Sequence, residues 1–204
     1  MLLRVVSGRV PRDRLSSVKE SLERGYVPVA HAVDGLERYL IGTRPSDAAD
    51  DELRIAFMTV WRDLESATVA VAGELTALRV LDGKEHGETL DHVDYYEVDI
   101  VEARRNPGRP RYLRLTAGTV GRGLDADIQR DLRSRLGELH PEIVDAYIGR
   151  RVTGASVEIA FVSAWTENAV PSRLLAPVWP DISSQYDVFW IQVFDVLLEG
   201  SPGR

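Results

Sequence analysis

A run of apolar residues that ends in tryptophan and leads into a polar, helix-prone segment occurs twice in this chain. The first copy is Ile55–Trp61, followed by residues 62–67, and the second is Ile159–Trp165, followed by residues 166–169. An apolar run of this length before a polar helix start predicts a strand that leads into a helix. Because the pattern recurs in the second half of the chain, the sequence indicates a duplication.

The first half predicts the element order βαββαβ, which is that of a ferredoxin-like unit. The predicted strands cover residues 3–10, 37–42, 55–61 and 93–100, and a second helix covers residues 64–80. The first helix has one apolar face, formed by Leu15, Val18, Leu22 and Tyr26. It is expected to end around Gly25 to Pro28, which would leave His31 in a loop.

The second half repeats this order, with predicted strands at residues 112–120, 145–149, 159–165 and 188–194. Its first helix has an apolar stripe of Ile128, Leu132, Leu136 and Leu139, and His140 falls where His31 fell. Pro171, Pro177 and Pro180 interrupt its second helix and leave room for about two turns. The predicted limits are a first repeat at 1–103, an Arg/Pro linker at 104–111, a second repeat at 112–200 and a tail at 201–204.

The strand at residues 55–61 has almost no polar residue on either of its two faces. A four-stranded sheet with helices on one side leaves its other side uncovered, so a strand of this kind needs a second layer. Two sheets that face each other would supply it. We therefore predict an α+β fold in which two fused ferredoxin-like βαββαβ repeats form an intramolecular dimeric α+β barrel. Such a chain would be a monomeric pseudo-dimer or would form a homodimer.

Composition and charge limit the class of protein and the kinds of partner that this chain can have. With 44% hydrophobic and 28% charged residues, the chain is typical of a soluble globular protein. Its net charge of −7 argues against a nucleic-acid partner, and no apolar run approaches the roughly 20 residues that span a bilayer. The absence of cysteine excludes disulfides, thiolate metal sites and cysteine nucleophiles. We expect a cytoplasmic protein with no membrane partner.

Three segments of the chain carry recognisable motifs, which are residues 4–10 in the first strand, Val60-Trp61 at the end of the third strand with the helix start behind it, and residues 95–98 in the fourth. Together they resemble the antibiotic biosynthesis monooxygenase (ABM-like) family of dimeric α+β barrels. The resemblance covers residues 2–101 and 112–199 and implies a tandem, fused version of the family. It implies a cavity between helices and sheet that is lined by Trp61 and Trp165.

The same resemblance implies a choice of chemistry. Many members oxidise quinol-like aromatic substrates with O2 and use neither metal nor organic cofactor, whereas a related branch binds and degrades haem. The haem branch carries an Asn in the first strand, where this chain has Ser7 and Ala117, and a His on the second helix, where residues 64–80 contain none. Haem is therefore disfavoured. Some monooxygenases carry an Asn in the third strand, where this chain has Phe57 and Phe161.

Few polar residues are candidates for chemistry. His86 and His92 could remove a phenolic proton, and no cluster with metal-ligand spacing surrounds them. His31 and His140 recur in both halves and could be paired bases, although inheritance of a loop residue by duplication is the favoured interpretation. Tyr95 and Tyr96 alternate along one strand, so that one of them can line a cavity.

Large aromatic residues and arginines that are expected to be buried are the other candidates, in this case for binding a ligand. Trp61 and Trp165 could stack on an aromatic ligand or could equally be core residues, and Phe57 lies on the same strand face as Trp61. Arg4 and Arg114 occupy the same strand position in the two halves. A charge in such a strand either pairs within the fold or binds an anionic oxygen, and pairing is favoured because buried charges normally need partners.

The leading hypothesis is a cofactor-independent monooxygenase-like enzyme that oxidises an aromatic, quinol-like small molecule with O2. In this hypothesis His86, His92 and Trp61 carry the chemistry, and Trp165, Tyr95, Arg4 and Phe57 bind the substrate. The first half is favoured because the second has lost most of its second helix and thus a cavity wall. The alternatives are a non-catalytic ligand-binding or scaffold protein, favoured by the missing Asn, and haem binding or degradation.

Overall fold

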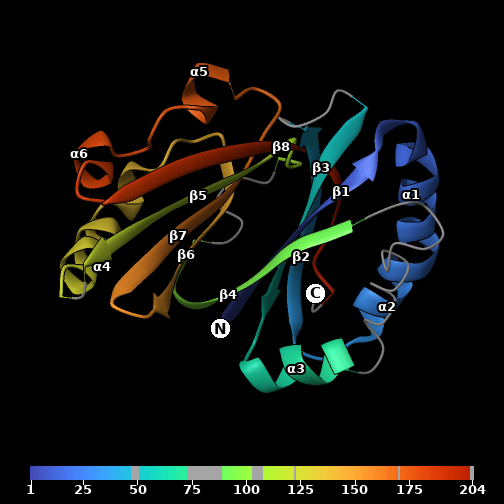
Figure 1. Cartoon of the computed structure of the whole chain (residues 1–204), viewed down its shortest axis with the longest axis horizontal. Helices are drawn as coiled ribbons and strands as arrows, with labels where there is room; N and C mark the ends of the chain where they lie inside the picture. The colour runs from blue at the N-terminus through green and yellow to red at the C-terminus, as the bar shows by residue number, and fades with distance from the viewer. Residues whose placement is uncertain (47–50, 73–88, 103–107, 122, 170, 203–204) are drawn as a thin grey trace. The chain divides into compact units, whose positions relative to one another are not determined.

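The structure of the protein is a computed structural model that describes residues 1–46, 51–72, 89–102, 108–121, 123–169 and 171–202 (Figure 1). Its strands are β1 (Leu2–Pro11), β2 (Leu36–Pro45), β3 (Glu52–Trp61), β4 (Thr89–Glu102), β5 (Tyr112–Gly121), β6 (Ile143–Thr153), β7 (Ser156–Trp165) and β8 (Val188–Gly200). They form a closed antiparallel barrel in the order β1-β3-β2-β8-β5-β7-β6-β4. The predicted α+β fold, a tandem-duplicated dimeric α+β barrel, is confirmed.

The helices are short and lie between the strands in sequence. They are α1 (Leu15–Ser21), α2 (Val27–Ala32), α3 (Leu64–Ala72), α4 (Asp125–Ser134), α5 (Pro171–Leu174) and α6 (Pro180–Ser183). A π-helical turn at Leu22–Tyr26 joins α1 to α2, and 3-10 turns lie at Arg12–Arg14 and Leu136–Glu138. None of these helices is both long and apolar enough to cross a bilayer.

The first helical segment is longer than the sequence predicted. It does not end around Gly25 to Pro28 but continues through α2 to Ala32. Pro28 is accommodated because it lies in the first turn of α2, where the N–H that proline lacks would have no partner within that turn. His31 therefore lies on a helix and not in a loop, and its side chain is exposed beside the ring of Tyr39.

The duplication extends to the register of strand pairing. In the first repeat β1 pairs with β3 so that Arg4 lies opposite Thr59. In the second repeat β5 pairs with β7 so that Arg114 lies opposite Ser163. The two tryptophans also occupy matching places, because Trp61 and Trp165 each end the central strand of their repeat. Equivalent positions of the two repeats can therefore be compared residue by residue.

The chain divides into two compact units, residues 1–95 with 194–204 and residues 96–193. The division falls inside β4 and β8, the two longest strands, with 14 and 13 residues. Residues 97–102 of β4 pair with β6, and residues 195–200 of β8 pair with β2. The repeat limits inferred from the sequence stay a prediction about the duplicated sequence unit. Residues 103–107 of the predicted linker lie outside the described residues.

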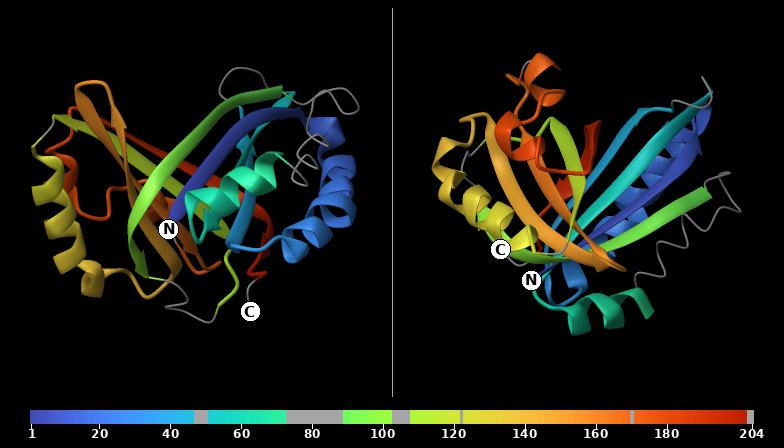
Figure 2. Two further views of the ribbon diagram at one scale, coloured as in Figure 1. Left: turned by 90° about the horizontal axis from the view of Figure 1, so that it is seen from below. Right: turned by 60° about the vertical axis from the view of Figure 1, so that its left-hand side comes forward.

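In each unit helices lie against one side of the sheet (Figure 2), and each unit has its own core of buried side chains. In the first unit Leu22 and Tyr26 pack on Phe57 and Trp61 of β3. In the second unit Ile128 and Leu132 of α4 and Ile182 of α6 pack on β7. The central strands β3 and β7 are buried along almost their whole length, as expected for strands with apolar residues on both faces.

A pair of glycines in β5 tests how tightly the second unit is packed. A Cβ at Gly118 would clash with Cδ1 of Tyr186 and lie 2.7 Å from the carbonyl oxygen of Val188, whereas a Cβ at Gly121 would meet nothing within 4 Å. We expect Gly118→Ala to lower the free energy of unfolding by about 1–3 kcal/mol and Gly121→Ala to leave it nearly unchanged. Urea unfolding followed by circular dichroism measures both. Equal effects of the two substitutions would contradict the close approach of Tyr186 to β5.

Candidate functional site

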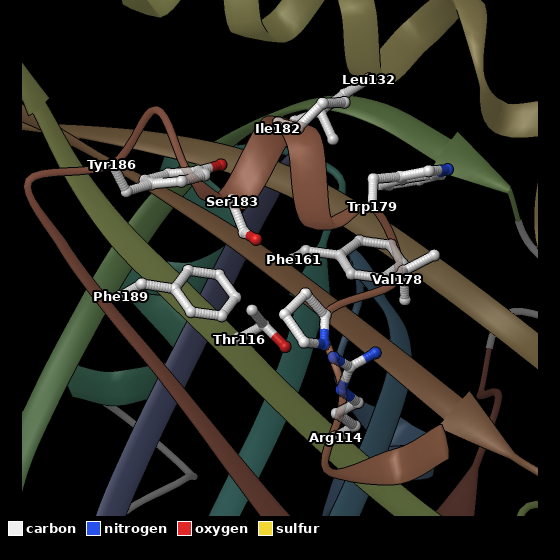
Figure 3. Close-up of a pocket in the computed structure, with 11 residues that line it drawn as sticks. Arg114, Thr116, Leu132, Phe161, Val178, Trp179, Ile182, Ser183, Tyr186 and Phe189 are labelled. Atoms are coloured by element: carbon white, nitrogen blue, oxygen red, sulfur yellow. The ribbon is translucent and has the colours of Figure 1, made fainter. Parts of the chain in front are cut away.

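The second unit contains a hollow between its sheet and the segment that links β7 to β8 (Figure 3). The empty space among the lining atoms amounts to about 310 Å³, counted out to the solvent at its mouth. The sheet contributes Arg114 and Thr116 from β5 and Phe161 from β7. The opposite wall comes from residues 177–179 and from α6. Because the volume of about 310 Å³ includes open solvent, and the space in which a water-sized sphere can be centred is only about 30 Å³, a ring-sized ligand needs the lining side chains to move apart.

Prolines shape the helical wall of this hollow. Pro171 and Pro180 lie at the starts of the four-residue helices α5 and α6, so that neither helix extends as far as α3 does in the first repeat. Ile182 of α6 is buried in the core, while Ser183 faces the hollow (Figure 3). An ion pair of 2.6 Å between Arg135 and Asp181 links the end of α4 to α6. The sequence predicts that this wall is lost with most of the second helix. In the structure residues 177–179 and α6 form a wall in its place.

Aromatic rings form the apolar body of the site. Phe161 and Trp179 pack with their ring centroids 5.6 Å apart and their planes tilted by 44°. Tyr186 and Phe189 form a second tilted pair with the same centroid separation. Burial raises the pKa of the Tyr186 phenol, so that this side chain is neutral at physiological pH. Rings at such angles offer flat apolar surfaces to a planar ligand.

Arg114 provides the charge at one end of the hollow (Figure 3). Its side chain has no exposed surface, and its Nη2 donates a hydrogen bond to the carbonyl oxygen of Ala176. The guanidinium also lies over the ring of Trp165, at 6.0 Å from the centroid. Burial lowers the pKa of Arg114 to about 10. The pairing that the sequence analysis favours for this arginine is not found among the described residues.

Trp61 and Trp165 are both buried and do not line the hollow. The indole N–H of Trp61 donates to Oγ1 of Thr59 at 2.9 Å, and that of Trp165 donates to Oγ of Ser163 at 2.8 Å. Each indole is therefore satisfied by a hydroxyl two residues earlier on its own strand. Trp165 still affects the site indirectly, because its ring lies beneath the Arg114 guanidinium.

The other predicted residues of the first unit belong to a packed aromatic cluster. Phe57 is buried, with its ring 6.2 Å from that of Tyr26, which in turn contacts Tyr39 at 5.5 Å. Arg4 lies over the ring of the partly exposed Tyr95 at 5.8 Å. Tyr26 thus occupies the space above Phe57, whereas the equivalent Phe161 of the second unit borders a hollow.

The predicted histidine bases are not placed beside the hollow. His86 lies outside the described residues, and His92 lies on β4 with a side chain that is also outside them. His140 is half-buried, contacts Glu142 and Arg173, and stacks on Trp165. Sequence reasoning missed Trp179, Tyr186 and Phe189 as lining residues. The signal available was the density of proline and aromatic residues between 171 and 190, which the sequence analysis interprets only as a broken helix.

The charge state of Arg114 leads to a stability prediction. Because burial lowers its folded pKa below the unfolded value, the charged form costs the fold free energy at neutral pH. We expect Arg114→Met to raise the free energy of unfolding by about 1 kcal/mol or more. Arg151→Met is the matched control, since Arg151 is half-buried and paired with Glu158 at 2.6 Å, and it should lose about 1.5–3 kcal/mol.

The pH dependence has a defined sign. The advantage of Arg114→Met is complete below the folded pKa of about 10 and shrinks as the pH rises through it, because native arginine then releases its proton. Urea unfolding at pH 7, 9 and 10.5 measures the difference. A loss of stability in Arg114→Met similar to that in Arg151→Met would show that the guanidinium is satisfied within the fold.

No family model matches the chain, and no curated protein matches it by sequence. Solved structures do match over nearly the whole chain. A provisionally assigned monooxygenase from Fusobacterium nucleatum superposes with a TM-score of 0.73 at 15% identity, covering 98% of this chain and 94% of that one. An anthrone oxidase-like protein gives a TM-score of 0.55 at 14% identity, with 100% and 94% covered.

Haem proteins share the same architecture. A haem-binding protein from Thermus thermophilus matches with a TM-score of 0.53 at 10% identity, over 96% of this chain and 90% of that one. At such low identities the likeness concerns the fold and not the chemistry. The chain therefore has the fold of the ABM-like dimeric α+β barrels, built as a single chain with two repeats, and its structural neighbours include monooxygenase-like proteins.

Proposed function

We propose that the protein is a cofactor-independent, monooxygenase-like enzyme that oxidises an aromatic, quinol-like small molecule with O2. The observation that carries this proposal is the aromatic hollow of the second unit with a buried arginine at its end. The names of two structural neighbours, a provisionally assigned monooxygenase and an anthrone oxidase-like protein, agree with this class of reaction. We assign the substrate to the second unit, although the sequence favoured the first, because the described residues form an aromatic hollow there, whereas the ring of Tyr26 lies against Phe57 in the first unit.

The reaction is balanced without a further reductant. A ring CH2 group loses two hydrogens and gains one oxygen atom as a carbonyl, and the second atom of O2 leaves as water. Loss of a proton from the substrate gives an electron-rich anion that can react with O2, and a nearby cation stabilises that anion. In this scheme Arg114 lowers the energy of the anion, and Phe161 and Trp179 hold the ring. His86 and His92 remain bases predicted from the sequence alone, and the described residues that line the hollow include no histidine.

A second candidate function is ligand binding without catalysis. It is favoured by one specific feature, which is that the eleven described residues that line the hollow include no histidine and no carboxylate. Side chains of those kinds are the usual general bases. Phe161 also stands where some members of the resembled family have an Asn. The two candidates share the binding site and differ only in whether O2 is consumed.

The described residues that line this hollow do not fit haem. A haem iron needs an axial ligand such as histidine, cysteine, methionine or tyrosinate. Tyr186 is the one such residue in the described lining of the hollow. Its burial raises the pKa of the phenol, which opposes the tyrosinate form that ligation requires. No step of the proposed reaction involves haem.

Two adjacent serines allow the proposed site to be tested. Ser183 faces the hollow and is half-buried, whereas Ser184 is exposed, and each hydroxyl bonds to a carbonyl three residues earlier. We expect 2-naphthol and anthrone to quench tryptophan fluorescence saturably. Ser183→Phe should raise the Kd at least about tenfold, because its ring fills the hollow, and Ser184→Phe should leave the Kd unchanged. Oxygen uptake, recorded in parallel, reports turnover.

Trp179→Phe and Trp61→Phe complete the experiment. Trp179 borders the hollow, so that its loss should abolish most of the quenching, while Trp61→Phe should retain it. Wild-type affinity in Ser183→Phe, with its thermal stability preserved, would rule out the hollow as the site. Saturable binding with no oxygen uptake would reject the enzyme and support the ligand-binding alternative.

A further inference from the structure

The polar end of the hollow has more hydrogen-bond donors than the fold uses. Arg114 has five N–H groups, yet its described contacts are the carbonyl of Ala176 and the ring of Trp165. Its Nε and Nη1 are buried and have no hydrogen-bond partner within the described part of the protein. A buried guanidinium left in this state is costly unless something else completes it.

A second unpaired donor lies beside it. Thr116 is two residues further along β5, so that its side chain is on the same face of the strand as that of Arg114. Its Oγ1 is buried and also has no partner among the residues that the structure describes. Both side chains line the hollow, and Figure 3 shows the Thr116 hydroxyl on the side of the arginine. The two groups form one donor cluster at the end of an otherwise aromatic space.

Two other arginines of the chain have acidic partners. Arg38 of the first unit, which is only slightly exposed, binds Glu199 at 2.8 Å. Arg151 of the second unit binds Glu158 at 2.6 Å, and Glu158 also accepts a hydrogen bond from Tyr96. No acidic side chain lies among the described residues that line the hollow. A ligand is therefore the natural source of a counter-charge for Arg114.

From these contacts we infer that the hollow selects an anionic aromatic ligand, whose ionised oxygen binds Arg114 and Thr116 while its ring lies against Phe161 and Trp179. A guanidinium and an oxyanion form short, charge-assisted hydrogen bonds, and Thr116 supplies one further donor. The oxyanion is a carboxylate or an ionised phenol or enol, since both present the same acceptor. This inference rests on the proposed binding site and names the chemical class of its ligand.

The test compares matched ligands in the absence of O2, so that binding is separated from turnover. The probes are 2-naphthoate and 2-naphthamide, which share a ring and a shape but differ in charge. We expect wild-type protein to bind the carboxylate at least about tenfold more tightly than the amide. Arg114→Met should remove this preference while retaining amide binding, and Arg114→Lys should keep part of it, because an ammonium is a cation without the planar fork.

Two further substitutions serve as controls for the cluster. Thr116→Val removes the hydroxyl with little change of shape and should weaken naphthoate binding about threefold to tenfold. Thr119→Val, on the opposite face of the same strand, should leave it unchanged. A nitro-substituted naphthol, titrated below and above its own pKa, separates the two sources of the oxyanion. Tighter binding on ionisation indicates that a phenolate is accepted, and an effect restricted to naphthoate indicates that a carboxylate is required.

Three results would overturn the inference. They are equal affinity for naphthoate and naphthamide, a preference that survives in Arg114→Met, and no binding of any probe up to millimolar concentration. Failure of the proposed oxidation has a different signature. Anion-selective binding under nitrogen combined with no oxygen uptake in air would leave the inference standing and reject the enzyme. Oxygen uptake with neutral naphthols and no charge preference would do the reverse.

Discussion

The burial of one central strand on both faces is the constraint on which the rest of each unit depends. β3 and β7 carry apolar or small side chains along both faces, so that each needs a helical layer on the side where Phe57 and Trp61, or Phe161 and Trp165, project. In the first unit α1 and the π-helical turn after it supply this layer, with Leu22 and Tyr26. In the second unit α4 covers part of the strand, and a proline-rich segment covers the remainder less tightly. The hollow lies where that cover is incomplete.

The helical layers of the two repeats differ, so that one repeat is tightly packed while the other contains a hollow. The aromatic cluster around Tyr26 satisfies packing in the first unit. In the second unit, the shorter helices α5 and α6 give up close packing and leave Arg114 with unused donors. Buried groups without partners cost stability, and proteins commonly carry such costs where they bind ligands.

Much of the fold could be predicted because its signals are local. Alternating and continuous apolar runs marked the strands, and the recurrence of Ile55–Trp61 as Ile159–Trp165 revealed the duplication. The end of the first helix could not be predicted well, because Pro28 normally indicates a stop and here begins a further helical turn. The site was less accessible to sequence reasoning. Whether Trp179 or Tyr186 faces a hollow depends on how a loop folds back on β5, and whether Arg114 is paired depends on residues distant in sequence.

The C-terminal half of β8 belongs to the first unit, and this affects how the chain folds during its synthesis. Residues 195–200 of β8 pair with β2 and so belong to the first unit, and Arg38 contacts Glu199 across 161 positions of sequence. On the ribosome, therefore, the first unit cannot be finished when its own repeat emerges, and β2 waits for β8 as an open strand edge. Unpaired edges of this kind invite association with other chains. In the first unit, this edge therefore stays unpaired until β8 has been translated.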